Sequence, residues 1–220
     1  MNVKAVIFDM DGVIIDSEPI HITSEKEIFN SLGISLSDEE HHSFVGTTSE
    51  LMWGKLKSKF DLPLSVSELV DLNTACFMKN LENRITIEPI LGILNLIKQL
   101  NNNGFILVIA SSSLNSQISF ILNKLKISHY FQSIISGNDV KQGKPNPEIF
   151  LKAAESIHLA PECCVVIEDS YNGVMAAKNA NMKCIGFKNP NSGNQDLSKV
   201  DIEIRSFKEL SLAMIEGLFK

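Results

Sequence analysis

The second half of this chain alternates between short apolar runs and stretches with helical periodicity, and this rhythm constrains the fold more than any other feature. The apolar runs lie at 105–110, 131–135, 163–167 and 183–187, with a weaker one at 201–204. Because their apolar residues are continuous, they are typical of strands buried on both faces of a parallel sheet. The run VKAVIF at 3–8 has the same character, and we expect it to join this sheet.

Residues 18–88 follow a different pattern, because they contain no convincing strand and instead repeat the signals that start helices. Pro19 suits the first turn of a helix, and Gly33 suits a helix end. A hydroxyl residue with a glutamate three positions later can cap the first turn of a helix. Such pairs occur at Ser37/Glu40, Thr47/Glu50 and Ser65/Glu68.

These patterns together predict an α/β fold with two domains. Residues 1–16 and 90–220 are expected to form a Rossmann-like core, which is a parallel sheet with helices on both faces. Residues 17–89 are expected to form a helical bundle, inserted after the first strand and lying over the end of the sheet.

The charge balance excludes several classes of partner. The net charge is −6, without a long run of one sign, so neither a nucleic-acid patch nor a basic membrane-binding face is indicated. The apolar run at 3–8 is too short to span a membrane, and without a recognisable targeting segment we expect a cytoplasmic protein. The four cysteines lack metal-binding spacing and are expected to be buried apolar residues.

Reactive polar residues follow the predicted strands at the point where each strand ends. Open α/β sheets bind ligands beyond the carboxyl ends of their strands, so these residues are expected to meet at one edge. They are Asp9 and Asp11 after the first run, Ser111 and Ser112 after 105–110, Lys144 in the loop after 131–135, and Glu168 and Asp169 after 163–167.

Carboxylates that share a small volume need a cation to remain ionised together. Asp9, Asp11, Asp169 and Glu168 offer hard oxygen ligands, which suit Mg²⁺ together with water and substrate phosphate. Asp9 and Asp169 offer side-chain oxygens, Asp11 its main-chain carbonyl, and Glu168 is either a ligand or a hydrogen-bond partner of metal-bound water. A calcium loop is poorly supported, because the spacing of such loops is absent.

The remaining polar residues of this edge suit a phosphoryl group. Ser111 and the backbone N–H of Ser112 can donate to phosphoryl oxygens, and Lys144 supplies the positive charge that the overall composition lacks. A helix cap at Ser111 and a plain surface lysine at 144 are the alternatives.

The two aspartates of the first loop then acquire separate roles. Asp9 is predicted to attack phosphorus and form an aspartyl-phosphate. Asp11 is predicted to protonate the leaving alcohol and then to deprotonate the attacking water. Gly12 permits a tight backbone path at this turn.

These residues, in this order, resemble the four motifs of the haloacid dehalogenase superfamily, and the resemblance covers essentially the whole chain. DMDGVIIDSEPIH, KPNPEIF and IEDSYNGVMAAKNA look like the branch that contains beta-phosphoglucomutase and small sugar-phosphate phosphatases. The inserted helices resemble the C1-type cap of that family. The resemblance implies Mg²⁺-dependent chemistry on a small phosphorylated metabolite, such as a sugar phosphate or a phosphoglycolate-like compound. We expect a monomer or a weak oligomer.

Details of the motifs favour a phosphatase over its relatives. The dehalogenases of the superfamily lack the second aspartate, which is present here as Asp11. Beta-phosphoglucomutases resemble this chain but carry a cap arginine a few residues after the glycine that matches Gly46, and Ser49 stands at that position here. A mutase with Lys79 or Arg84 as its phosphate anchor is the alternative, and a non-catalytic binding protein is a third interpretation.

Two further residues are candidates for substrate contact through the resemblance. His21 matches a histidine near the start of the cap, although a lone histidine on an amphipathic helix is as often packed or solvated. Asn115 matches a position near the phosphate, although an exposed turn asparagine is nearly as common.

Overall fold

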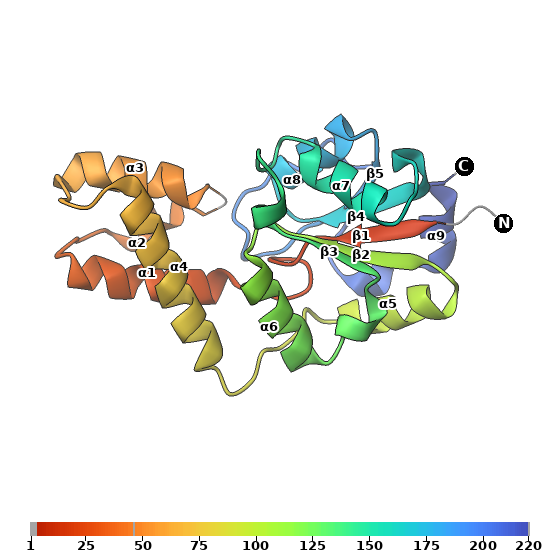
Figure 1. Cartoon of the computed structure of the whole chain (residues 1–220), viewed down its shortest axis with the longest axis horizontal. Coiled ribbons are helices and arrows are strands. Elements are labelled where there is room, and N and C mark those ends of the chain that lie inside the picture. Colours follow the sequence, from red (N-terminus) through yellow and green to blue (C-terminus); the bar gives the residue numbers. More distant parts are fainter. Residues whose placement is uncertain (1–3, 46, 220) are drawn as a thin grey trace. The chain divides into compact units, whose positions relative to one another are not determined.

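The computed structural model describes residues 4–45 and 47–219, and Figure 1 draws the chain. Contacts within the chain divide it into two compact units. One contains the residues up to Asp16 and those from Ile87 onward, and the other contains Ser17–Thr86. We call them the core unit and the helical unit. Gly46 is the glycine from which the position of the mutase cap arginine was counted, and it lies outside the described residues.

The described residues of the core unit contain a parallel six-stranded sheet, as the apolar runs predict. The strands are β1 (Ala5–Phe8), β2 (Ile106–Ala110), β3 (Ser133–Ile135), β4 (Cys164–Glu168), β5 (Lys183–Phe187) and β6 (Ile202–Ile204). Their order is β3-β2-β1-β4-β5-β6, so β1 lies in the interior of the sheet between β2 and β4. All the pairings are parallel, which aligns the carboxyl ends of the strands at one edge.

Helices cover both faces of this sheet, which confirms the predicted Rossmann-like architecture. The helices of the core unit are α5 (Ile93–Asn102), α6 (Asn115–Leu125), α7 (Glu148–Ser156), α8 (Tyr171–Asn179) and α9 (Leu212–Gly217). Figure 1 shows α5 and α6 on one side of the sheet and α7 and α8 on the other. Single turns of 3-10 helix lie at Ser128–Tyr130, Gly137–Asp139, Pro161–Cys163 and Phe207–Glu209.

Burial of apolar side chains explains how α7 and α8 hold to the sheet. Ile7 and Val166 point from neighbouring strands into a cluster that also contains Phe150 of α7 and Val174 of α8. All four are fully buried or nearly so. Burial of each such side chain stabilises the fold by about 1.5–3 kcal/mol, so this cluster holds α7 and α8 against the sheet.

The helical unit consists of helices in its described residues, as predicted for the insertion. They are α1 (Glu18–Ser31), α2 (Asp38–His42), α3 (Ser49–Phe60) and α4 (Val66–Glu82). A cluster of buried apolar residues holds them together, with Phe29 of α1, Trp53 of α3 and Leu69 of α4 among its members.

The helix-start signals are confirmed at two positions and displaced at the third. Ser65 and Glu68 form a complete capping box, and Ser37 accepts from the N–H of Glu40. The predicted cap Thr47 is wrong by one residue, because Thr48 caps α3 and accepts from the N–H of Leu51. Consecutive threonines offer the same hydroxyl, so the sequence alone does not separate the two.

Within the described ranges, the helices are too short or too polar to cross a membrane.

Candidate active site

The register of the sheet brings the predicted site residues of the core unit to one place. Phe8 lies beside Ile109 of β2 and Ile167 of β4, so the three strands end within one residue of the same level. The N–H of Asp9 still donates to the carbonyl of Ile167 at 3.0 Å, which fixes the first residue beyond β1. The site therefore begins where the hydrogen-bonded sheet ends.

The turn after β1 is tight and depends on glycine. The Met10 carbonyl accepts the N–H groups of Val13, Ile14 and Ile15, so the chain folds back over it. Gly12 has a φ of +80°, which L-residues with side chains rarely adopt. A Cβ at Gly12 would also lie 1.9 Å from Oδ2 of Asp169. The prediction that Gly12 permits a tight path is confirmed, and the glycine also makes room for Asp169.

Lys144 joins two strand ends electrostatically. Its ammonium donates to Oδ1 of Asp9 at 2.5 Å and to Oε1 of Glu168 at 2.6 Å, and it also reaches the Ala110 carbonyl at 3.3 Å. The lysine side chain is only 7% exposed, so solvent screens these ion pairs weakly. The peptide bond from Lys144 to Pro145 is cis.

The site contains more carboxyl groups than ammonium groups. Burial raises the pKa of the Asp9 carboxyl to about 8, although Lys144 acts in the opposite direction. Burial, with the charges of Glu168 and Asp9, also raises the pKa of Asp169 well above its ordinary value. Burial alone would lower the pKa of Lys144, but its attraction to Asp9 and Glu168 raises it above the ordinary range. One permanent ammonium thus faces several buried carboxyl groups that resist ionisation together.

The donor set fits a hard divalent cation. One carboxylate oxygen from each of Asp9, Glu168 and Asp169 lies within 4.8 Å of the others, and all three residues are buried. Oxygen ligands of this kind suit Mg²⁺, and a cation would relieve the repulsion that raises the pKa values of Asp9 and Asp169.

Glu168 is already engaged on both of its oxygens. Oε1 accepts from Lys144, and Oε2 accepts from the N–H groups of Asp169 and Ser170 and from the Ser170 hydroxyl. This pattern favours the sequence-based alternative in which Glu168 orients neighbouring groups. Of the three clustered carboxylates, those of Asp9 and Asp169 accept fewer hydrogen bonds from the protein than that of Glu168.

Asp11 contacts serine hydroxyls, and it is not a member of the carboxylate cluster. Its Oδ2 accepts from Ser113 Oγ at 2.5 Å and lies 3.4 Å from Ser111 Oγ, while its buried Oδ1 has no hydrogen-bond partner among the described residues. The carboxylate of Asp11 therefore has one oxygen held by hydroxyls and the other without a protein donor. Ser111 was predicted from the sequence and Ser113 was not, because three consecutive serines offer no basis to distinguish one hydroxyl from another.

The other predicted site residues lie apart from these contacts or in the helical unit. The Ser112 side chain is exposed, as is Asn115, whose N–H faces Asn138 Oδ1 at 3.4 Å. His21 belongs to α1 of the helical unit, where its ring stacks on Phe77 with centroids 4.2 Å apart. Packing within the helical unit thus accounts for the placement of His21.

The loop after β5 supplies contacts that the sequence motifs did not indicate. Ser192 Oγ donates to Oδ2 of Asp169, and the buried Asn189 donates to the Gly12 carbonyl at 3.0 Å. The signal available in the sequence was the polar composition of this loop directly after a strand, which is the position that identified the other site residues.

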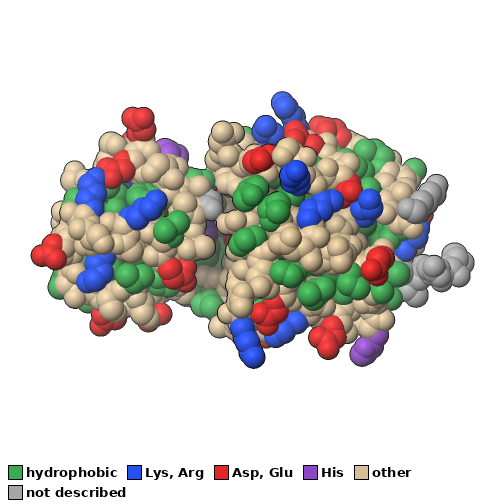
Figure 2. Space-filling view, turned by 90° about the horizontal axis from the view of Figure 1, so that it is seen from above, with side chains coloured by type: hydrophobic (Ala, Val, Ile, Leu, Met, Phe, Trp, Pro, Cys, Tyr) green, Lys and Arg blue, Asp and Glu red, His purple; other side chains and the backbone are tan. Residues whose placement is uncertain are grey.

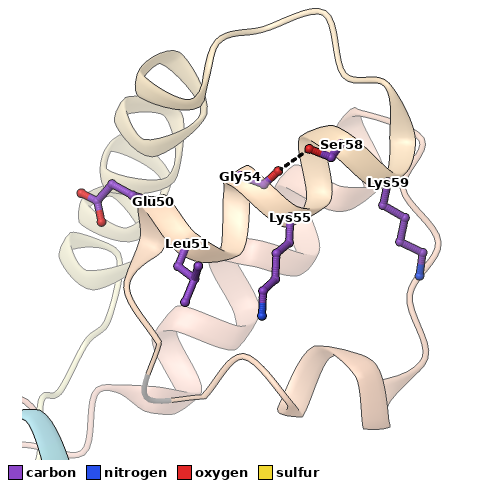
Figure 3. A pocket seen from close by; sticks show the side chains of 6 residues that line it. All are labelled: Glu50, Leu51, Gly54, Lys55, Ser58 and Lys59. Atoms are coloured by element: carbon purple, nitrogen blue, oxygen red, sulfur yellow. Dashed lines mark hydrogen bonds between the residues drawn. The ribbon is translucent and has the colours of Figure 1, made fainter.

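Charged side chains of both signs are interspersed on the face seen in Figure 2. A hollow on α3 of the helical unit is lined by Glu50, Leu51, Gly54, Lys55, Ser58 and Lys59 (Figure 3). Its lysines have partners within the unit, because Lys59 pairs with Glu40 and Lys55 lies over the Phe44 ring. The hollow contains none of the predicted site residues.

A set of carboxylates, one buried lysine and serine hydroxyls at the carboxyl edge of a parallel sheet defines a site suited to phosphoryl chemistry. A family model described as haloacid dehalogenase-like hydrolase matches residues 6–187. The chain therefore belongs to the haloacid dehalogenase-like hydrolase family, and the predicted resemblance is confirmed.

The names of similar proteins are consistent with membership of this family. The chain is 32% identical to a putative phosphatase, YhcW, of Bacillus subtilis, over 97% of this chain and 96% of the relative. It is 31% identical to the beta-phosphoglucomutase of Bacillus subtilis, over 96% and 93%. It is 28% identical to hexitol phosphatase B of Escherichia coli, over 98% of both. The predictions of a phosphatase-type hydrolase and of the beta-phosphoglucomutase-like branch are confirmed at this level.

A solved structure supports the same fold. The crystal structure of CbbY from Rhodobacter sphaeroides in complex with phosphate superimposes with a TM-score of 0.84 and 25% identity, covering 98% of this chain and 100% of that one.

Proposed function

We propose that the protein is a Mg²⁺-dependent phosphatase that hydrolyses a small phosphorylated metabolite, a sugar phosphate or a phosphoglycolate-like compound, through an aspartyl-phosphate on Asp9. The observation that carries the proposal is the Lys144 ammonium, which bridges Asp9 and Glu168 beside Asp169. In this arrangement a phosphoryl group entering near Asp9 meets a fixed positive charge in an otherwise acidic site.

The first half-reaction uses Asp9 and Asp11. A carboxylate oxygen of Asp9 attacks phosphorus, and the bond between phosphorus and the ester oxygen breaks. Asp11 gives its proton to the departing alkoxide, so the products are an alcohol and the acyl phosphate of Asp9. Ser113 holds Oδ2 of Asp11, which leaves Oδ1 as the oxygen suited to carry this proton.

The second half-reaction returns the enzyme to its starting state. Asp11, now ionised, takes a proton from a water molecule as the water attacks phosphorus. The bond between phosphorus and the Asp9 oxygen breaks, which releases inorganic phosphate and the free carboxylate. Lys144 stays paired with Asp9 and Glu168 and offsets the negative charge that accumulates between them.

Mg²⁺ held by Asp9 and Asp169 would supply charge stabilisation for the phosphoryl oxygens. The main-chain carbonyl of Asp11 completes the predicted set, with Glu168 as a hydrogen-bond partner of metal-bound water. Ser111 and the Ser112 N–H are proposed to donate to phosphoryl oxygens. The helical unit, proposed as a cap, carries His21 as a candidate substrate contact, and Asn115 of the core unit is a second candidate.

The names of the relatives support the proposed class of substrate. A hexitol phosphatase and a beta-phosphoglucomutase are both similar to this chain over nearly its whole length. The likeness to the mutase favours a phosphosugar isomerase as the second candidate. Ser49, at the position of the mutase cap arginine, supports the phosphatase instead. A cytoplasmic location and a monomeric or weakly associating chain are proposed with it.

A phosphate-release screen tests the proposal. The purified protein is incubated with several dozen phosphorylated metabolites, once with Mg²⁺ and once with a chelator. We expect release from a small number of sugar phosphates or phosphoglycolate-like compounds with Mg²⁺ only. Interconversion of hexose phosphates that a bisphosphate stimulates would favour the mutase, and no turnover of any compound would contradict both.

A further inference from the structure

The loop Asn189–Ser192, which follows β5, has no role in the motifs that identified the other site residues. It leaves the sheet next to β4, the strand that ends at Glu168 and is followed by Asp169. We call it the β5 loop. Its side chains reach both of the segments that carry the proposed metal ligands.

Ser192 holds the Asp169 carboxylate from one side. Its hydroxyl donates to Oδ2, the oxygen that also lies against the backbone of Gly12. With Oδ2 fixed between a hydroxyl and a glycine, the Asp169 carboxylate has a defined orientation, and Oδ1 is the oxygen that remains for a cation. A ligand that is oriented in advance binds a metal more tightly, because less freedom is lost on binding.

Asn189 holds the turn that carries Asp9 and Asp11. It is 6% exposed, and its Nδ2 donates to the Gly12 carbonyl at 3.0 Å while its Oδ1 accepts from the N–H of Asn191 at 2.9 Å. The buried amide is thus satisfied on both sides. The bond connects residues 177 positions apart and fixes the β5 loop against the first site loop.

Three further hydrogen bonds brace the β5 loop itself. Asn191 Nδ2 donates to Oδ2 of Asp16 at 2.5 Å, at the end of the same turn. Gln195 Nε2 donates to the Ser192 carbonyl at 2.9 Å, and its Oε1 accepts from the Tyr171 N–H at 2.9 Å in the first turn of α8. The Ser192 hydroxyl is therefore presented from a backbone that is tied down on both sides.

From this geometry we infer that the β5 loop is a positioning element of the metal site, with Ser192 orienting Asp169 and Asn189 fixing the Gly12 turn. The inference rests on the proposed function, because it assigns the loop a role towards the Mg²⁺ that the phosphatase uses. Ser192 and Asn189 act through Asp169 and Gly12, so they are positioning residues.

Titration calorimetry with MgCl₂ alone, on the full chain, tests the inference without knowledge of the substrate. Ser192→Ala removes the hydroxyl, and we expect the Mg²⁺ dissociation constant to rise by about tenfold or more. Ser192→Thr keeps the hydroxyl and should bind within about twofold of the wild type. Asn194→Ala, in the same segment but exposed, is the matched control and should also bind like the wild type.

A purely structural role for Ser192 makes a different prediction. It would lower the melting temperature in chelator without changing the Mg²⁺ affinity of the folded protein. An unchanged dissociation constant in folded Ser192→Ala overturns the inference. Should that variant not fold, Ser192→Cys keeps the volume with a weaker donor, and an affinity equal to that of the wild type overturns the inference in the same way.

The same titration separates this inference from the proposed function. Wild-type protein that binds Mg²⁺ but hydrolyses no phosphate ester contradicts the phosphatase, while a weakened Ser192→Ala still supports the positioning role. Wild-type protein that binds no Mg²⁺ overturns both. In an active enzyme, Ser192→Ala should need about tenfold more Mg²⁺ for half-maximal rate and recover most of kcat at saturating Mg²⁺.

Discussion

The Lys144 ammonium donates to Oδ1 of Asp9 at 2.5 Å, although the two residues are 135 positions apart in the chain. Lys144 lies in the loop that follows β3, and Asp9 follows β1, so the pair spans β2, the strand between them. The pair can form only when β1, β2 and β3 are assembled side by side. Activity and folding of the core are therefore expected to depend on the same residue.

Replacing Lys144 by methionine should impair both properties. Removing one partner of a buried ion pair costs about 3–5 kcal/mol, because it leaves an uncompensated charge. We expect the free energy of unfolding at about pH 8 to fall by this amount, and kcat/KM to fall by roughly a hundredfold or more. The exposed Lys141→Met in the same loop is the control for both, measured by chemical denaturation and phosphate release. Full activity in Lys144→Met would argue against the proposed role.

Asp9→Asn should abolish turnover without unfolding the protein. The amide cannot form an acyl phosphate, so we expect phosphate release to drop to background. Because the pKa of Asp9 is raised to about 8, its ionisation is unfavourable in the metal-free protein, and asparagine avoids that cost. At about pH 8.5 the melting temperature in chelator should therefore be at or above that of the wild type. Mass spectrometry of quenched wild-type reactions should locate phosphate on the peptide that contains Asp9. Substantial activity in a homogeneous Asp9→Asn preparation would sink the mechanism.

The sequence predicted those parts of the site that lie directly at strand ends. Asp9, Ser111 and Glu168 follow continuous apolar runs, and parallel strands bring their carboxyl ends to one edge. The positions of these residues were therefore fixed by the fold class. Lys144 needed more, because it lies in a loop well beyond β3. It was predicted from the positive charge that an acidic phosphate site needs, and the resemblance to a family motif added to this.

The sequence did not predict the contacts between loops. Ser113 was not distinguished from Ser111 and Ser112, because the direction of each hydroxyl depends on the turn and on Gly137, whose N–H donates to the Ser113 carbonyl. Asn189 and Ser192 were missed because the β5 loop matches none of the motifs used.

Ser113→Ala should slow proton transfer with little effect on binding. Its hydroxyl holds Oδ2 of Asp11 at 2.5 Å, and the loss of one such bond is worth about 1 kcal/mol. We expect kcat to fall about fivefold to tenfold with KM nearly unchanged. Ser116→Ala, exposed at the start of α6, is the control. A rise in KM with unchanged kcat would instead place Ser113 in substrate binding.

Metal-free protein should become less stable as the pH rises towards 8. The pKa of Asp9 is raised to about 8 in the folded protein, against an ordinary value of 3.8 for the unfolded chain. Between these values the folded state holds a proton that the unfolded state has released, so unfolding becomes easier as the pH rises through this window. The raised pKa of Asp169 acts in the same direction. Lys144, whose pKa is also raised, stays charged throughout this window and adds no slope.

Mg²⁺ should remove much of this pH dependence, because the cation replaces the proton between the carboxylates. Melting temperatures measured from about pH 5 to about pH 8.5, in chelator and in Mg²⁺, should therefore diverge as the pH rises. Carboxyl groups with lowered pKa values, such as Asp139 and Asp201, affect both series equally and only at lower pH. Parallel curves would show that Asp9 and Asp169 do not hold the cation.

Alanine at two helical glycines should change stability in opposite directions. Glycine inside a helix normally costs about 0.5–1 kcal/mol relative to alanine, so Gly54→Ala in α3, where a Cβ meets no atom within 4 Å, should stabilise by about that amount. A Cβ at Gly173 of α8 would lie 1.8 Å from Oε1 of Glu168, the oxygen that Lys144 contacts. Gly173→Ala should therefore destabilise by about 1–3 kcal/mol and reduce activity, since Glu168 or α8 must shift. Denaturant unfolding measures both variants, and a stabilised, fully active Gly173→Ala would show that the position of Glu168 does not matter for catalysis.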